Sequence, residues 1–366
     1  MTGPVVQIVQ HLRPGGIECM VLDLTARSRQ PSLIVSLEGD RAAALEAWPR
    51  LAPMADRMVF LGKSAGISPA TILRLARLLR SLNASAVHTH HIGPLLYGGL
   101  AARLAGTARI VHTEHDAWHL EDPRRRRVER TLLRLVRPSL VADSAMVARS
   151  MHQALGPRNL TVIDNGIDTA RFAPANRIAA RSTLGLPLDV PIVGTAARLE
   201  AVKGVDVLID AAARVPGVHV AVAGDGSVRA DLEHQARSLG IADRVHFLGR
   251  IDDMAAYYPA LDRFCLSSRH EGLPLSLLEA QACDVPAIVT PVGAMPDGID
   301  PTTGHVAAAV DGDAVAEAIR RSFDGRPGAG PRPHVVRHFS LETMLSAYEE
   351  LWHDRDDTRQ PDLAAA

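Results

Sequence analysis

The chain has 366 residues, enough for one large or two medium domains, and its 47% hydrophobic and 22% charged residues are ordinary for a folded soluble protein. Its three scattered cysteines exclude a disulfide framework, and no apolar run approaches the roughly 20 residues of a membrane-spanning helix. The N-terminus also lacks the basic start and apolar core of a signal peptide, so we expect a cytoplasmic protein.

The expected elements alternate along the whole chain. The first half predicts strands at 5–9, 33–37, 58–61, 86–89, 109–113, 140–142 and 161–163, with helices such as 70–82 and 95–104 between them. The second half predicts strands at 192–196, 218–223, 245–248, 263–266, 287–289 and 306–309, and a last helix at 341–352. This alternation predicts an α/β protein with doubly wound parallel sheets, whose ligand loops follow the carboxyl ends of the strands.

Two polar stretches mark the expected domain boundaries. Residues 168–177 are polar and contain proline after a strand, and residues 324–333 are rich in glycine and proline. We therefore expect an N-terminal domain over 1–172, a second domain over 173–335, and a C-terminal part over 336–366 that holds the last helix and a frayed tail.

The net charge of −1 conceals an asymmetry between the two halves. Residues 1–172 hold 22 Lys and Arg against 14 Asp and Glu, or +8, and the remainder holds 18 against 27, or −9. The basic half could face a membrane surface, an anionic glycan or a polyprenyl phosphate carrier, or the asymmetry could be a chance distribution of solvated charge. Only Lys63 and Lys203 are lysines among 40 basic residues, which suggests a need for a compact point charge at those positions.

Glycines follow the first expected strand, where a helix begins. Gly15 and Gly16 let the backbone come close to a ligand, and the helix N-terminus offers free N–H groups and a positive dipole to a phosphate. An ordinary tight turn has the same sequence pattern, and the stretch is not the G-x-G-x-x-G dinucleotide fingerprint.

Two cations frame the loop after the strand at 192–196. Arg198 and Lys203 at this carboxyl end could clamp a diphosphate and neutralise the charge that builds on a departing phosphate, although a solvated surface pair is the alternative. The turn at 224–227 follows the next strand, where Ser227 can cap the following helix and Asp225 is expected to be structural.

Two glutamates bracket the start of a helix in the second half. Gly272 and Pro274 place Glu271 in a loop before that helix, with Glu279 two turns inside it. A carboxylate can hold two sugar hydroxyls at once, as acidic residues do for ribose in dinucleotide sites. The backbone N–H groups that could meet phosphates are those near Leu273, Leu275 and Ser276.

Metal motifs are poorly placed in this sequence. Residues 311–313 and 354–356 both match D-x-D, but the first match precedes a helix as a cap would and the second lies in the tail. With Arg198 and Lys203 present, a divalent ion is not required at a leaving phosphate. We therefore expect no metal site and no cofactor.

Taken together, the motifs resemble glycosyltransferase family 4, a large retaining family with the GT-B fold, from Val6 to about Tyr348. The motifs are GGIE at 15–18, HTEHD at 112–116, NGID at 165–168, RLEAVKG at 198–204, AGDGS at 223–227, VHFLGR at 245–250 and EGLPLSLLE at 271–279. Each is weak alone, but their order and spacing are specific. The resemblance implies two Rossmann-like domains that face each other across a cleft, with the last helix crossing back to the first domain.

The resemblance also implies roles for single residues. Glu279 would bind the ribose of the nucleotide, and Glu271 would bind hydroxyls of the donor sugar. Arg198 and Lys203 would hold the diphosphate, and His115 would contact the donor sugar near its 6-position. Further donor contacts would come from Gly15, Gly16, Gly224, Leu248, Gly249, Arg250, Gly272, Leu273, Leu275 and Ser276. At residues 272–274 this sequence has Gly-Leu-Pro, whereas many members of the family have Gly-Phe-Gly. This difference leaves donor specificity open.

The function implied is a retaining hexosyltransferase that moves a sugar from a UDP- or GDP-sugar to a glycan or lipid-linked acceptor, in bacterial exopolysaccharide, lipopolysaccharide or other cell-envelope synthesis. We expect front-face attack, with the leaving phosphate taking the acceptor proton. A sugar-nucleotide epimerase of the same architecture is the enzyme alternative, and a non-catalytic nucleotide-binding module is the other. A dehydrogenase lacks support, because the dinucleotide fingerprint is absent.

A basic segment at 123–137 bears on localisation. As a helix from Pro123, it would place Arg126, Arg130, Arg134 and Arg137 on one face, and Val128, Leu132, Leu135 and Val136 on the other. Basic amphipathic helices bind anionic lipid, which predicts peripheral binding at the inner face of the cytoplasmic membrane through Arg124–Arg127. The alternative is an ordinary helix packed on the sheet with its arginines in water. We expect no nucleic-acid partner.

Overall fold

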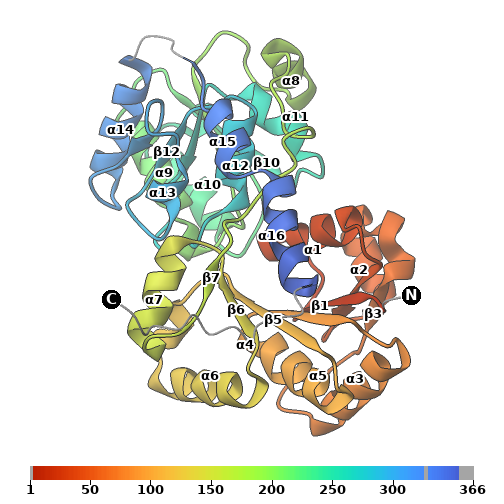
Figure 1. Ribbon diagram of the computed structural model, residues 1–366. Helices are drawn as coiled ribbons and strands as arrows, with labels where there is room; N and C mark the ends of the chain where they lie inside the picture. The colour runs from red at the N-terminus through yellow and green to blue at the C-terminus, as the bar shows by residue number, and fades with distance from the viewer. Residues whose placement is uncertain (1–2, 325–328, 354–366) are drawn as a thin grey trace. The chain divides into compact units, whose positions relative to one another are not determined.

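The computed structural model describes residues 3–324 and 329–353, and its contacts divide the chain into two compact units (Figure 1). Unit 1 comprises the described residues of Met1–Asp143, Ala148–Ile163 and Met344–Ala366. Unit 2 comprises Ser144–Val147 and the described residues of Asp164–Thr343. The main division thus falls between Ile163 and Asp164, whereas the sequence suggested 172 and 173; the expected domain limits stay a prediction.

Unit 1 is built on a parallel sheet of seven strands in the order β3-β2-β1-β4-β5-β6-β7. The strands are β1 (Val5–Val9), β2 (Ser32–Ser36), β3 (Met58–Phe60), β4 (Ala86–His90), β5 (Arg109–Glu114), β6 (Ser139–Ala142) and β7 (Thr161–Val162). The strand order reverses between β1 and β4, so their loops open beside one another at the carboxyl edge, where doubly wound sheets bind ligands.

Several helices of unit 1 begin at a residue whose side chain caps the first turn. The α-helices of this unit are α1 (Gly16–Arg27), α2 (Arg41–Ala47), α3 (Pro69–Ser81), α4 (Ile92–Pro94), α5 (Leu100–Ala105), α6 (Pro123–Val136) and α7 (Ala145–Leu155). Ser68 caps α3 by accepting the Thr71 N–H, and Asp122 caps α6 by accepting the Arg124 N–H. Short 3₁₀ turns cover Pro49–Arg57 and Trp118–Glu121.

The helix expected at 95–104 is interrupted. Its first part, Leu95–Gly99, is a π-helical turn that leads into α5. A Cβ on Gly98 would lie 2.5 Å from Ile8 Cδ1, and one on Gly99 would lie 2.9 Å from Val136 Cγ1. The two glycines therefore let this segment lie close against β1 and α6, which apolar periodicity alone does not reveal.

Unit 2 has a parallel sheet of six strands in the order β10-β9-β8-β11-β12-β13. The strands are β8 (Ile192–Ala196), β9 (His219–Ala223), β10 (Val245–Gly249), β11 (Arg263–Leu266), β12 (Ala287–Val289) and β13 (His305–Val306). The α-helices are α8 (Arg177–Leu184), α9 (Val205–Ala213), α10 (Arg229–Ser238), α11 (Met254–Tyr257), α12 (Leu275–Ala282), α13 (Met295–Gly298), α14 (Gly312–Asp324) and α15 (Arg332–His338). Aliphatic side chains dominate its core, as the scarcity of aromatic residues predicts, and Tyr257, Tyr258 and Phe264 are fully buried beside them.

The last helix, α16 (Leu341–His353), belongs to unit 1 from Met344 onward. There the Tyr348 hydroxyl lies 3.1 Å from Thr113 Oγ1, and the Glu349 carboxylate accepts the Arg29 N–H at 2.8 Å. The end of the chain therefore packs on strands and loops from its beginning. Among residues 3–324 and 329–353, no helix combines the length and apolar character that crossing a membrane requires.

Candidate functional site

The loop after β8 brings Lys203 to Glu271. Lys203 ends a short 3₁₀ turn over Ala201–Lys203, and Gly204 follows it with φ +63°. A Cβ on Gly204 would lie 2.0 Å from the Ser267 carbonyl oxygen, so only glycine fits there. This close approach places Lys203 Nζ 2.8 Å from Glu271 Oε1, although 68 residues separate the two in sequence.

The Glu271 carboxylate is held on several sides. Its side chain is 9% exposed, and Ser268 Oγ donates to Oε1 at 2.9 Å. Gly293, with φ +59°, lies so close that a Cβ there would be 1.9 Å from the Glu271 carbonyl oxygen. Sequence reasoning missed Ser268 and Gly293; a glycine in the proline-containing loop after a buried strand was the available signal for the latter.

Glu279 lies inside α12, the helix that follows the loop of Glu271. Glu271 stands in the loop before the helix, as expected, and Pro274 is the residue at its N-terminal boundary. The expectation of two turns was wrong, since α12 begins at Leu275 and Glu279 is only its fifth residue. The buried Tyr258 hydroxyl donates to Glu279 Oε2 at 2.5 Å. Burial and the negative charge of Glu279 raise the pKa of Tyr258 well above its ordinary value, so the phenol stays protonated and fixes the carboxylate.

The start of α12 is anchored through its preceding loop. Asn165 Nδ2 donates to the Leu273 carbonyl at 2.9 Å, and the Ala294 N–H donates to the Gly272 carbonyl at 3.2 Å. These bonds fix the backbone on both sides of Leu273. The first N–H groups of the helix, those of Leu275 and Ser276, therefore start from a fixed loop at the carboxyl edge of the sheet.

The glycine-rich turn after β9 packs on the loop that carries Arg198. A Cβ on Gly224 would lie 1.9 Å from the Ala197 carbonyl oxygen, and the Leu199 N–H donates to the Asp225 carbonyl at 2.9 Å. Arg198 itself is exposed. The expected cap by Ser227 was wrong: α10 begins only at Arg229, and Ser227 Oγ donates to Glu200 Oε2 instead.

The end of β10 completes this edge of unit 2. The Gly224 N–H donates to the Gly249 carbonyl at 2.7 Å. Gly249 adopts φ +67°, and the pairing of β10 with β9 shifts register between Phe247 and Gly249. Leu248 is half-buried, and Arg250 is 43% exposed and lies 3.6 Å from Asp252. The residues expected to frame the base therefore stand beside the turn that contains Gly224.

The expected site residues of unit 1 lie after β1 and β5. Helix α1 begins at Gly16, after Gly15 in an extended conformation that any residue adopts. Glu18 lies in the first turn, where its Oε1 is 3.3 Å from His11 Nδ1, and burial raises its pKa. A Cβ on Gly15 would meet Glu18 Oε2 at 2.3 Å, so the glycine leaves room for this carboxylate.

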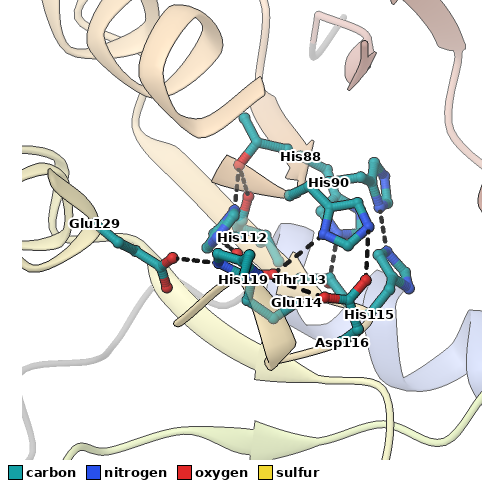
Figure 2. A network of polar contacts seen from close by, with 12 residues as sticks. His88, His90, His112, Thr113, Glu114, His115, Asp116, His119 and Glu129 are labelled. Carbon is teal, nitrogen blue, oxygen red and sulfur yellow. Dashed lines mark hydrogen bonds and ion pairs between the residues drawn. The ribbon is translucent and has the colours of Figure 1, made fainter. Parts of the chain in front are cut away.

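His115 follows β5 and is 7% exposed, with both ring nitrogens engaged (Figure 2). Its Nε2 lies 3.1 Å from His90 Nδ1, and its Nδ1 lies 3.5 Å from Asp143 Oδ2. The His90 Nε2 in turn lies 3.0 Å from Gln7 Oε1. A direct contact between the His115 ring and a sugar would therefore require the ring to give up one of these two partners.

The first D-x-D match behaves as a cap. Asp311 Oδ1 accepts the Ala314 N–H at 2.8 Å in the first turn of α14, and Asp313 Oδ1 forms an ion pair with Arg214 Nε at 2.8 Å. The second match, at 354–356, lies outside the described residues.

Helix α6 begins at Pro123, as expected, but the expected division of its faces was wrong. It buries Glu129, Leu132, Leu133 and Val136, while Val128 is 48% and Leu135 is 62% exposed. Arg130 Nη2 donates to the Ala154 carbonyl at 2.6 Å, so this arginine packs inward. The exposed residues of the helix include Arg124, Arg125, Arg127, Val128, Arg134 and Leu135.

The two units match two family models. Residues 5–171 match the model described as glycosyltransferase family 4, and residues 176–329 match the one described as glycosyl transferases group 1. The chain is similar to a protein of Mycolicibacterium gilvum named D-inositol 3-phosphate glycosyltransferase, 37% identical over 58% of this chain and 51% of that protein. A protein of Mycobacterium tuberculosis with the same name is 36% identical over 56% of this chain and 45% of that protein. The chain thus spans about half the length of these relatives.

Solved structures with the same fold cover nearly the whole chain. HepE from Anabaena in complex with UDP and glucose has a TM-score of 0.84 at 20% identity, over 95% of this chain and 98% of that one. The same protein with UDP-glucose gives 0.84 at 22% identity, over the same shares. Sucrose-phosphate synthase from Thermosynechococcus elongatus has a TM-score of 0.80 at 22% identity, over 96% of this chain and 98% of that one. The expected fold class, two parallel-sheet α/β domains of the GT-B type, is confirmed.

Proposed function

Because this chain belongs to glycosyltransferase family 4, the group 1 glycosyltransferases, we propose that it transfers a hexose from a nucleotide-diphosphate sugar to an acceptor hydroxyl with retention of anomeric configuration. The observation that carries this proposal is the meeting of Lys203 and Glu271 beside the N-terminus of α12, with Glu279 inside that helix. A cation, free backbone N–H groups and two carboxylates are what a sugar diphosphate needs.

The donor we propose is a UDP-sugar. Glu279, fixed by Tyr258, would accept the ribose hydroxyls, and the end of β10 would frame the base. The structural neighbour HepE, solved with UDP-glucose, supports UDP over GDP. A thermal-shift comparison of UDP, GDP and ADP tests the base, since a ligand that binds only the folded protein raises its apparent stability by mass action.

In the mechanism we propose, the protein positions the reactants and stabilises charge. Lys203 and Arg198 would hold the diphosphate, and their charge would stabilise the leaving group as its bond to the anomeric carbon breaks. The leaving phosphate would take the acceptor proton on the same face, which yields retention without a protein nucleophile. Glu271, now seen paired to Lys203, would turn toward sugar hydroxyls once the diphosphate takes the lysine.

For the acceptor, we propose a glycan or polyprenyl-phosphate-linked glycan of the cell envelope, reached at the inner face of the cytoplasmic membrane. The exposed face of α6 supports this, because it mixes Arg124, Arg127 and Arg134 with Val128 and Leu135. Cations attract anionic headgroups, and exposed apolar side chains insert between them. The mycobacterial relatives are named for a small phosphorylated acceptor instead, so both classes belong in the assay.

The test is a product analysis with UDP-sugars, a lipid-linked glycan and inositol phosphate as acceptors. The anomeric configuration of the product, read by proton NMR, should equal that of the donor. An inverted product would refute the mechanism. Conversion of the donor to its isomer without any acceptor would make the protein an epimerase, and tight nucleotide binding without any product would make it a binding module.

A further inference from the structure

Unit 1 contains a buried cluster of acidic and imidazole side chains at the carboxyl end of β5 (Figure 2). His112 and Glu114 come from β5, and Glu129 comes from α6. All three side chains are 0% exposed, and one ligand atom of each lies within 4.8 Å of the other two. The closest pair is His112 Nε2 and Glu114 Oε1, at 2.9 Å.

Each of the three also contacts a polar residue outside the set, here called its outer partner. The other ring nitrogen of His112 lies 2.9 Å from Thr89 Oγ1. The other oxygen of Glu114 lies 3.2 Å from His91 Nδ1, and Glu129 Oε2 lies 2.7 Å from His119 Nε2. Outer partners of this kind orient metal ligands in proteins and fix the tautomer of a ligating histidine.

The two outer histidines are themselves joined. Asp116 lies 3.7 Å from His91 Nε2 through one oxygen and 3.4 Å from His119 Nδ1 through the other. His112, Glu114 and Glu129 are therefore each held in place by a polar group outside the set. An ordinary surface ion pair is not held in this way.

One carboxylate oxygen of the three residues lacks a hydrogen-bond partner. Glu129 Oε1 is buried, and no hydrogen-bond donor among the described residues reaches it. A buried carboxylate oxygen without a partner is costly, and a second buried carboxylate nearby adds repulsion. A cation between the two carboxylates would remove both costs.

We propose that His112, Glu114 and Glu129 bind one divalent transition-metal ion, with zinc as the ion expected. One imidazole nitrogen and two carboxylate oxygens, without a thiolate, form a ligand set that zinc accepts at about 2.0–2.2 Å from each donor atom. Two donor atoms on one such ion lie no more than about 4 Å apart, so binding draws the three groups together by less than about 1 Å. The sequence shows no metal spacing because Glu129 lies on a separate element.

The ion would tie α6 to the end of β5. His115 directly follows Glu114, so the loop that presents it would be fixed through its neighbour. This role is positional and is separate from the diphosphate clamp proposed in unit 2. Failure of one proposal therefore leaves the other intact.

The experiment uses the full chain without a polyhistidine tag. The protein is dialysed against a chelator and titrated with Zn²⁺ in competition with a chromophoric chelator, and with Co²⁺ while visible absorption is recorded. We expect one equivalent of tightly bound ion and cobalt bands typical of nitrogen and oxygen ligands. Glu129→Gln should weaken zinc binding by at least tenfold, whereas Glu121→Gln, an exposed change in the preceding turn, should leave it unchanged.

Thermal unfolding separates a lost ligand from a lost fold. Zn²⁺ should raise the unfolding temperature of the wild type and of Glu121→Gln, but not that of Glu129→Gln. Wild-type protein without bound zinc, cobalt bands or a thermal shift at micromolar ion would overturn the proposal, and so would equal zinc affinity in Glu129→Gln. If Glu129→Gln fails to fold, the cobalt spectrum of the wild type decides whether the site exists: bands typical of nitrogen and oxygen ligands support it, and their absence refutes it.

Discussion

At the scale of single residues, the ion pair between Lys203 and Glu271 changes how the lysine is understood. Lys203 drew attention because the chain has only two lysines, and the structure gives it a nearly buried carboxylate as partner. A phosphate that binds Lys203 must compete with Glu271. In the proposed mechanism, the diphosphate would take the lysine from this pair and leave the glutamate to the donor sugar.

We predict that Lys203→Ala cripples transfer while the protein still folds. Loss of one charge-assisted phosphate contact should cost on the order of 2–4 kcal/mol of transition-state stabilisation, or about thirty- to a thousandfold in kcat. Steady-state kinetics and thermal unfolding of the same preparation measure the two effects. Near-normal turnover in Lys203→Ala would remove the lysine from the clamp.

The two glutamates should differ in their kinetic effects. Glu279→Ala removes a ribose contact far from the reacting bond and should mainly raise KM for the donor, whereas Glu271→Ala removes a contact that orients the sugar and should mainly lower kcat. Tyr258→Phe removes the hydrogen bond from the tyrosine hydroxyl to the Glu279 carboxylate. This variant should therefore also raise KM for the sugar donor, but by less than Glu279→Ala does. Unchanged donor affinity in Glu279→Ala would refute the ribose assignment.

At the scale of elements, buried histidines on β4 make unit 1 sensitive to acid. Burial lowers the pKa of His88 and of His90 well below the ordinary 6.5. Below that value the unfolded chain takes up protons that the folded unit excludes, so the free energy of unfolding falls as the pH falls. Each histidine contributes a slope of at most about 1.4 kcal/mol per pH unit.

We therefore predict that His88→Gln flattens the acid side of the stability profile, whatever its effect at neutral pH. Denaturant unfolding between pH 7 and pH 4.5 gives the slope. His152→Gln, at an exposed position on α7, should keep the slope of the wild type. Parallel profiles for all three proteins would show that His88 does not contribute to acid unfolding.

The predicted binding to an anionic membrane depends on the exposed arginines of α6. Replacing Arg124, Arg125 and Arg127 with Gln should weaken binding to anionic vesicles about a hundredfold at low salt, since each cation near the lipid contributes about 1 kcal/mol. Three exposed arginines of α3, Arg74, Arg77 and Arg80, give a control with the same loss of charge. Co-sedimentation measures both variants. Wild-type protein that ignores anionic vesicles, or equal loss in both variants, would favour a soluble acceptor.

At the scale of the whole molecule, we predict that transfer survives excess EDTA at a temperature well below unfolding. Arg198 and Lys203 would supply the charge that a divalent ion supplies elsewhere, and the described D-x-D match is a helix cap. Activity is measured before and after chelation. Loss restored by magnesium or manganese would contradict the prediction, whereas loss restored by zinc alone would point to the buried cluster of unit 1.

The sequence by itself determined the α/β class, the strands to within a few residues, and the family. Strands buried on both faces need continuous apolar runs, helices need periodic ones, and the turns between them need glycine or proline, so each signal is local. The motifs of the proposed donor site were readable for the same reason, since each one lies within a single connection after a strand. Even the cap at Asp311 follows from its place directly before a helix.

Only the tertiary structure decided which side chains meet. Lys203 joins Glu271, Tyr258 joins Glu279, and Glu129 of α6 joins His112 and Glu114 of β5. These partners lie 15 to 68 residues apart, and no local pattern encodes such distances. The faces of α6 were misjudged for a related reason: the sheet and its neighbouring elements determine which residues are buried, and here they bury a glutamate while Val128 and Leu135 stay exposed.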